Sequence, residues 1–219
     1  MAGRKSGLRQ FLFYNMRKSN FKAGYFDNFD ETYYTTDGYD DYLTRFKEEG
    51  NDLVSRLIKV IEPDSSWYFL DVGCGMGGTI LALRELKYKA WGIETSSFCL
   101  ERSPAKNWMK AGNVCKLSYK DNSFNVVICM DVLCYLNKQK AIQASKELVR
   151  VAKHYLYIES VCKGSPNSNQ RLNPDLLRKD RDLLTKNELK RMFENNDTLF
   201  LKPLYTKKES PDFNGVFVK

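Results

Sequence analysis

The sequence predicts one α/β domain, a doubly wound and mostly parallel sheet with helices on both faces. Apolar runs of strand length alternate with helix-like segments along most of the chain, which is the pattern of repeated βαβ units. A glycine-rich turn follows the first of these runs, and no linker or internal repeat divides the chain. With 219 residues, the chain is long enough for one such domain with a filled core and short for two.

The N-terminal part of the chain differs in composition from the rest. Residues 1–22 carry six basic and no acidic side chains, and residues 23–52 carry nine acidic and two basic ones. We expect residues 1–46 to form a basic arm and an aromatic-acidic lid segment, and residues 47–219 to form the domain. The arm could bind nucleic acid or be a solvated tail. The lid, residues 25–46, could cover a ligand or pack its tyrosines on the domain surface.

Hydrophobic spacing predicts the elements of the domain. Leu53, Leu57 and Ile61 recur at helical intervals and predict an amphipathic helix that ends at Pro63. The elements expected after it are strands at 67–72, 89–93, 108–111, 124–130 and 154–159, and helices at 78–86 and 138–152.

The C-terminal part is expected to add one helix and two strands. Thr185 and Glu188 have the spacing of a capping box, so a helix should begin there and end near Asn195. Residues 198–204 and 215–218 would complete the sheet as its sixth and seventh strands.

The glycine-rich turn is the strongest functional signal in the chain. Its glycines, Gly73, Gly75 and Gly78, follow an apolar strand, and Glu94 ends the next strand, which is the general form of a nucleotide-cofactor site. The same spacing fits a dinucleotide. However, the carboxylate of Asp71 would repel a pyrophosphate placed over the turn, whereas it would favour a cationic sulfonium amino acid.

Three segments of the chain resemble a known family. LDVGCGMGG, WGIE and GNVCKLSYKDNSFNVVICMDVLCYL are similar, in order and spacing, to the motifs of class I S-adenosylmethionine-dependent methyltransferases of the small, type 11-like kind. The resemblance covers residues 68–160 strongly and 183–219 loosely. It implies a Rossmann-like methyltransferase fold, S-adenosylmethionine as cofactor and methyl transfer as the reaction. It says little about the methyl acceptor.

The resemblance implies donor-binding roles for the glycine-rich turn and the residue that ends the second strand. Asp71 and the backbone of Gly73 and Gly75 would hold the methionine part of the donor, and Cys74 would contribute through its backbone. Glu94 would accept hydrogen bonds from both ribose hydroxyls.

Three further residues would complete the donor site. Asn113, at a position where the family usually has Asp, would lie beside the adenine, and Val114 would offer its backbone N–H to the ring. Met130 would present its backbone carbonyl near the amino group of the donor. The alternatives are an ordinary turn role for Asn113 and a core role for the Met130 side chain.

Asp131 and Tyr135 are the candidate catalytic residues, because both follow the fourth strand on the side expected to face the acceptor. Asp131 could instead cap a helix. Tyr33 and Tyr34 of the lid are weaker candidates. The one histidine, His154, enters the fifth strand at the opposite edge of the sheet from the ligand, so we expect it to be structural.

The acceptor is inferred mainly from motifs that are missing. The chain has none of the motifs typical of amino-methylating or cytosine-methylating DNA enzymes or of protein arginine methyltransferases. We therefore expect an oxygen or nitrogen atom of a small molecule, such as a sugar or a nucleotide-linked or other metabolite, with the loop at 162–182 as a substrate wall. The alternatives are an RNA or protein methyltransferase that uses the basic arm, a non-catalytic methyltransferase-like binding module, and a dehydrogenase.

Cysteine usage and hydropathy suggest the compartment. The six cysteines show no metal-ligand spacing, so we expect no metal and interpret them as small buried side chains in a reducing cytoplasm. No apolar run is long enough to cross a membrane, and we recognise no signal peptide. The oligomeric state is not indicated.

Overall fold

A computed structural model gives the fold of the chain. It describes residues 29–35, 42–165, 183–206, 210 and 212–219. The predicted basic arm, parts of the lid and most of the loop at 162–182 lie outside the described residues.

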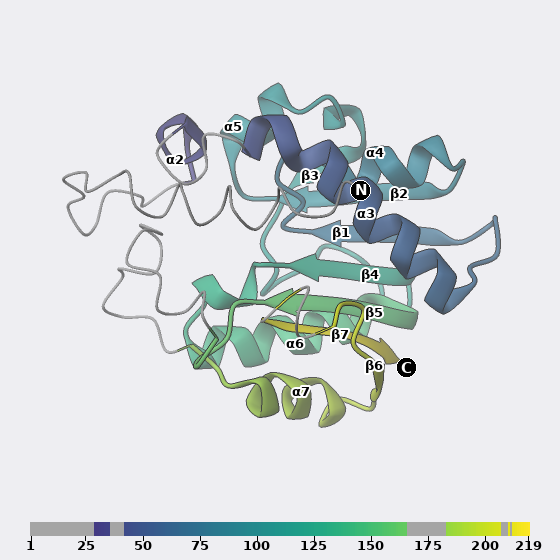
Figure 1. Ribbon diagram of the computed structural model, residues 1–219, viewed down its shortest axis with the longest axis vertical. Helices are drawn as coiled ribbons and strands as arrows, with labels where there is room; N and C mark the ends of the chain where they lie inside the picture. Colours follow the sequence, from purple (N-terminus) through teal and green to yellow (C-terminus); the bar gives the residue numbers. More distant parts are fainter. Residues whose placement is uncertain (1–28, 36–41, 166–182, 207–209, 211) are drawn as a thin grey trace, which may run out of the picture.

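In the described residues, seven strands form one sheet in the order β3-β2-β1-β4-β5-β7-β6 (Figure 1). Strands β1 to β5 pair in parallel, and β7 runs antiparallel to both β5 and β6. The predicted α/β fold with a mostly parallel seven-stranded sheet is therefore confirmed. The strands are β1 (Tyr68–Val72), β2 (Lys89–Glu94), β3 (Met109–Ala111), β4 (Phe124–Met130), β5 (Ala152–Ser160), β6 (Leu199–Lys202) and β7 (Phe213–Val218).

Helices cover both faces of the sheet (Figure 1). One core packs α3 and α4 against one face, and the other packs α6 and α7 against the opposite face. The α-helices are α2 (Glu31–Thr35), α3 (Tyr42–Ile61), α4 (Gly78–Glu85), α5 (Ser97–Arg102), α6 (Lys138–Val151) and α7 (Lys186–Glu194). Short 3-10 helices are η1 (Lys106–Trp108) and η2 (Leu133–Tyr135).

Most predicted boundaries agree with the structure, and the capping box at the start of α7 is present. The Thr185 side chain accepts a hydrogen bond from the Glu188 backbone N–H, and the Glu188 carboxylate accepts one from the Thr185 N–H. The main difference is at α3. This helix begins at Tyr42, so it crosses the boundary expected between residues 46 and 47. Its first turns are apolar enough to pack, and Phe46 lies buried beside Met76.

A close crossing of α3 and α4 brings the N-terminal half of α3 near the carboxyl ends of the central strands. Gly50 on α3 lies against the first residue of α4, Gly78, so tightly that a Cβ atom on Gly50 would lie 2.3 Å from the Gly78 carbonyl carbon. A Cβ atom on Gly78 would in turn meet the Phe46 carbonyl oxygen at 1.9 Å. Only glycine at both positions permits this contact.

Candidate functional site

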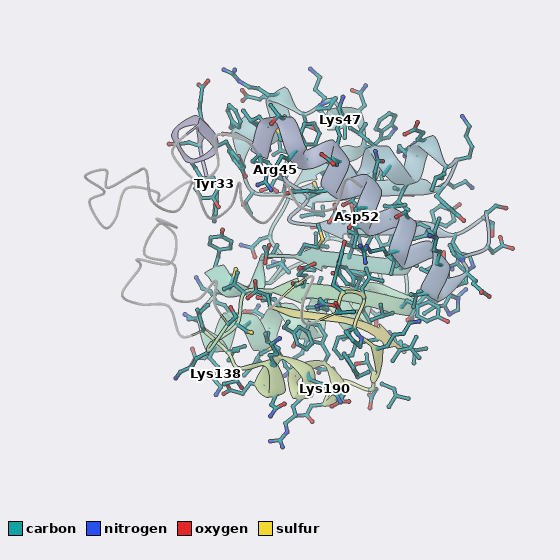
Figure 2. The ribbon with its side chains drawn as sticks, viewed as in Figure 1. Tyr33, Arg45, Lys47, Asp52, Lys138 and Lys190 are labelled. Carbon is teal, nitrogen blue, oxygen red and sulfur yellow. The ribbon has the colours of Figure 1, made fainter. Side chains whose placement is uncertain are left out.

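A pocket of about 510 Å³ opens at the carboxyl ends of β1, β2 and β4. The strand order reverses direction between β1 and β4, and ligands of open α/β sheets bind at such a switch point. Figure 2 places Tyr33 and Arg45 on the side of the molecule toward which the arrows of these strands point. The pocket brings together all ten residues predicted from the sequence, Asp71, Gly73, Cys74, Gly75, Glu94, Asn113, Val114, Met130, Asp131 and Tyr135.

The glycine-rich turn is held against the end of β2 by its own backbone. Gly73 and Gly75 have φ angles of 76° and 50°, which glycine adopts without strain. The N–H groups of Gly73 and Cys74 both donate to the carbonyl oxygen of Ile93, at 2.8 and 3.2 Å. These two N–H groups are therefore already used, and a ligand over the turn would meet mainly its carbonyl and Cα atoms.

Glu94 is buried at the end of β2 and organises the backbone around it. Its Oε2 accepts a hydrogen bond from the N–H of Gly75 at 2.7 Å. Its Oε1 accepts three more, from the N–H groups of Thr95 at 2.7 Å and Ser96 at 2.9 Å and from the Thr95 hydroxyl at 3.3 Å. A carboxylate has about four accepting positions, about two on each oxygen. One position, on Oε2, therefore remains for a ligand hydroxyl, and a second hydroxyl would have to displace one of these partners.

Asp71 is a buried carboxylate that faces the pocket from the end of β1. Burial raises its pKa to about 7, against a hydrogen bond from Thr79 that lowers it, and the nearby Glu94 raises it further. A cation placed beside Asp71 would compensate this buried charge. The site therefore suits a positively charged group of a ligand.

Asn113 and Val114 form the far wall of the pocket in the loop between β3 and β4. The Asn113 side-chain oxygen accepts a hydrogen bond from the Cys115 N–H at 2.8 Å, so the turn role considered for Asn113 is present in the structure. Val114 is buried in the core that α6 covers. Both residues still line the pocket.

Two charged side chains of α6 anchor this loop from behind. The Glu147 carboxylate accepts a hydrogen bond from the Leu117 N–H at 2.7 Å. The Arg150 guanidinium donates to the carbonyl oxygens of Leu117 and Tyr119, at 3.0 and 2.7 Å, and pairs with Glu147. The pocket wall is therefore tied to α6 by hydrogen bonds of charged groups, which are the stronger kind.

Asp131 follows β4 with a left-handed backbone, φ 50°, and its N–H donates to the Glu159 carbonyl oxygen at 2.9 Å. More than a third of its surface is accessible, but that surface lines the pocket, where protein surrounds it. Burial raises the pKa of Asp131 to about 6, and Asp212 and Glu49 raise it further. A carboxyl group whose pKa lies near neutral pH can accept and release a proton.

Tyr135 meets the described part of the lid across the pocket. Its hydroxyl lies 2.8 Å from the hydroxyl of Tyr33 in α2, and its ring packs edge-on against Phe29 at 4.9 Å. Ser96 donates to the Phe29 carbonyl oxygen at 2.6 Å and fixes that end of the segment. The sequence left open whether the lid covers a ligand or packs its tyrosines on the domain surface. In the structure these aromatic residues line the pocket.

Five residues of α3 line the pocket, and the sequence reasoning named none of them as a site residue: Tyr42, Arg45, Phe46, Glu49 and Gly50. The Tyr42 hydroxyl accepts a hydrogen bond from the Met76 N–H at 3.0 Å, directly over the glycine-rich turn. Arg45 and Glu49 form an ion pair at 2.6 Å and also line the pocket. The spacing of three and four residues puts Tyr42, Arg45 and Glu49 on one helical face, which is the signal that could have found them.

The histidine, metal ligands and a membrane-spanning helix do not contribute to the described pocket. His154 is in β5, beside Trp67 at 5.1 Å, and does not line the pocket, as expected. Among the described residues, no group of three or more His, Cys, Asp or Glu side chains is placed to hold a metal ion. No helix in the described part of the chain is both long and apolar enough to cross a membrane.

The fold and the pocket define a Rossmann-like protein with a nucleotide-cofactor site. Residues 70–156 match the model of a methyltransferase domain. Over these residues the match indicates a class I methyltransferase domain of the S-adenosylmethionine-dependent kind, with S-adenosylmethionine as its cofactor. The pocket fits this cofactor, since Asp71 offers a buried carboxylate for its amino group and Glu94 an accepting oxygen for a ribose hydroxyl.

Individual relatives are distant. An uncharacterized protein of Methanocaldococcus jannaschii is 28% identical over 97 residues, 44% of this chain and 42% of that protein, so the chain spans less than half of this relative. A protein of Pyrococcus horikoshii has a similar structure, with a TM-score of 0.63, 18% identity and coverage of 85% of this chain and 95% of that one. Magnesium protoporphyrin IX methyltransferase of Synechocystis, solved with bound SAH, also has a similar structure. Its TM-score is 0.61 at 15% identity, and the match covers 98% of this chain and 95% of that one.

Proposed function

We propose that the chain transfers the methyl group of S-adenosylmethionine to an oxygen or nitrogen atom of a small molecule. The observation that carries this proposal is one pocket that is lined by a buried acid, a glycine-rich turn, a second acid and, after β4, Asp131 and Tyr135. When bound, the cofactor supplies an activated methyl group on a sulfonium. The protein has mainly to bind, align and handle a proton.

Donor binding is assigned to the β1, β2 and β3 side of the pocket. Asp71 compensates the amino group, with Met130 contributing a carbonyl oxygen nearby, and Glu94 accepts a ribose hydroxyl. Asn113 and Val114 form the part of the pocket wall that lies beside the adenine. Arg45 faces the same cavity from α3 and offers a cation for the carboxylate of the methionine part.

Catalysis is assigned to the side formed after β4. Asp131 faces the cavity with a carboxyl group that can accept a proton, and the Tyr135 hydroxyl is held in place by Tyr33. Alignment of the acceptor contributes the larger part of the rate, on the order of 7–11 kcal/mol for well-oriented groups. A proton acceptor contributes about 10²- to 10⁴-fold more.

The test is to incubate the full chain with isotopically methyl-labelled donor and a cell extract separated into small molecules, RNA and protein. We expect the label in the small-molecule fraction, identified by mass spectrometry. Label confined to RNA or protein would contradict the proposed acceptor class. No binding of S-adenosylmethionine in calorimetry would contradict the donor site itself.

A further inference from the structure

Three aromatic residues that line the pocket, Phe29, Tyr33 and Tyr135, pack together. Phe29 packs against Tyr33 with ring centres 5.0 Å apart and planes at 72°, and against Tyr135 at 4.9 Å and 83°. The hydroxyls of the two tyrosines meet at 2.8 Å, so the rings form one connected group. The three rings pack edge to face against one another and all line the pocket, and the electron-rich face of a ring that lines a pocket attracts a cation.

The charged side chains that line the pocket also favour a cation. Among the lining residues that the structure describes, the acids are Glu49, Asp71, Glu94 and Asp131, and the base is Arg45. Arg45 is paired with Glu49 at 2.6 Å and is already assigned to the carboxylate of the donor. With Asp71 and Glu94 assigned to the donor, Asp131 presents a negative charge to the acceptor.

A second layer of carboxyl groups lies behind Asp131. The Glu159 carbonyl oxygen accepts a hydrogen bond from the Asp131 N–H. The Glu159 carboxyl group accepts hydrogen bonds from the hydroxyls of Tyr157 and Ser210. Burial raises the pKa of Glu159 to about 7, and repulsion from Asp131 and Asp212 raises it further. A cation in the pocket would relieve this repulsion, whereas a phosphate would increase it.

We propose that the methyl acceptor is an amine, which enters as its ammonium ion and is held between the Asp131 carboxylate and the rings of Phe29, Tyr33 and Tyr135. This inference rests on the proposed function and narrows its acceptor. Nucleotide-linked acceptors, which the sequence left open, are disfavoured because the described pocket offers a phosphate no base other than the paired Arg45.

The reaction requires the amine to lose a proton first. Burial raises the pKa of the Asp131 carboxyl to about 6, which brings it closer to the pKa of an ammonium ion and makes the carboxylate a better proton acceptor. The proton passes to Asp131. The nitrogen lone pair then forms the bond to the methyl carbon, whose bond to sulfur breaks with its electron pair left on sulfur.

The class of the acceptor can be tested without knowing its name. Products labelled from the methyl donor in a small-molecule extract are separated on cation and anion exchangers near neutral pH. We expect the label on the cation exchanger. Label in the neutral or anionic fraction would overturn the amine assignment and leave methyl transfer intact, whereas no labelled small molecule would overturn both.

Two variants examine Asp131 itself. In D131N we expect the labelled amine to fall about 10²-fold or more, with donor affinity unchanged in calorimetry. The matched control is D197N, because Asp197 is an exposed aspartate with a similar left-handed φ of 60°. Equal losses in both variants, or full activity of D131N, would overturn the assignment.

A binding measurement separates recognition from turnover. The purified methylated product is dialysed against the wild-type protein and D131N without donor, at about pH 5 and about pH 8. Asp131, with its pKa raised to about 6, loses its charge at the lower pH while the amine stays protonated. Wild-type binding should therefore weaken on acidification more than D131N binding does, since Asp71 and Glu159, with pKa values raised to about 7, also lose charge in this range in both proteins. Wild-type binding that is independent of pH would contradict the proposal.

Discussion

Three backbone N–H groups converge on the carboxylate of Glu94, those of Gly75, Thr95 and Ser96. The same carboxylate is the proposed partner of the donor ribose. Two roles therefore meet in one side chain, since it shapes the glycine-rich turn before it can bind a ligand. Asp71 differs, because the described groups that shift its pKa, Thr79 and Glu94, include no cation, so a cationic ligand would compensate its buried charge.

Replacing Glu94 by Gln should weaken donor binding. The amide keeps the shape but turns a donor toward N–H groups that need an acceptor, and it removes the charge. Hydrogen bonds to a charged group contribute about 1.5–3 kcal/mol, so we expect a Kd raised about 10- to 100-fold. Calorimetry with S-adenosylmethionine measures this. E85Q, at the exposed end of α4, is the control and should bind as the wild type does; equal binding by E94Q would contradict the assigned role.

Replacing Glu159 by Gln should stabilise the protein at high pH. Its pKa is raised from 4.5 to about 7 in the folded state, so folding is penalised once pH exceeds the unfolded value, fully so above about 7. We expect E159Q to gain about 1–3 kcal/mol at pH 8 and nothing near pH 4, measured by urea unfolding.

The opposite sign is expected at Glu188, which serves as the comparison. Backbone and side-chain hydrogen bonds to Thr185, together with Lys138, lower its pKa to about 2. E188Q should therefore lose stability near neutral pH, and that loss should shrink as pH falls through the range between the two pKa values. A loss of stability in E159Q at pH 8 would contradict the raised pKa of Glu159.

At the scale of elements, hydrophobic spacing predicts the strands to within two residues, because parallel strands buried on both faces are continuous apolar runs. The run at 124–130 is β4 itself. The donor residues are predictable for a similar reason, since they occupy strand ends and turns that are contiguous in sequence. Tyr42, Arg45 and Glu49 are not, because they reach the pocket only through the packing of α3 on α4.

The crossing of α3 and α4 can be tested at Gly50. Alanine there would place a Cβ atom 2.3 Å from the backbone of Gly78, and α3 would have to move away. We expect G50A to lose about 1–3 kcal/mol in urea unfolding. It should also bind S-adenosylmethionine more weakly, because Tyr42 and Arg45 move with the helix. S55A, on the exposed side of α3, should change neither quantity, and normal donor binding by G50A would contradict this coupling.

At the scale of the whole molecule, the pocket joins the N-terminal part of the described chain to the centre of the sheet. Its lining includes α2 and α3 from the N-terminal side and β1, β2 and β4 from the centre of the sheet. The strands on either side of the switch point pair directly, β1 with β2 and β4. Donor binding should therefore stabilise the fold as a unit rather than one segment of it.

Saturation with S-adenosylmethionine tests this unity. At a free donor concentration 100 times Kd, the free energy of unfolding should rise by about 2.7 kcal/mol. Tryptophan fluorescence and far-ultraviolet circular dichroism should shift together in urea. If the two signals separate, with only one moved by the donor, the pocket and the rest of the sheet unfold independently.

Arg150 supports the wall of the donor pocket from outside the pocket, so a substitution there can change the wall indirectly. Its guanidinium holds the carbonyl oxygens of Leu117 and Tyr119 from the outer side of α6, without lining the cavity. A substitution such as Arg150→Ala would release the loop that carries Asn113 and Val114, and would weaken the donor complex without removing any atom that touches it. A variant with poor donor affinity and intact pocket residues therefore directs attention to the outer surface of α6.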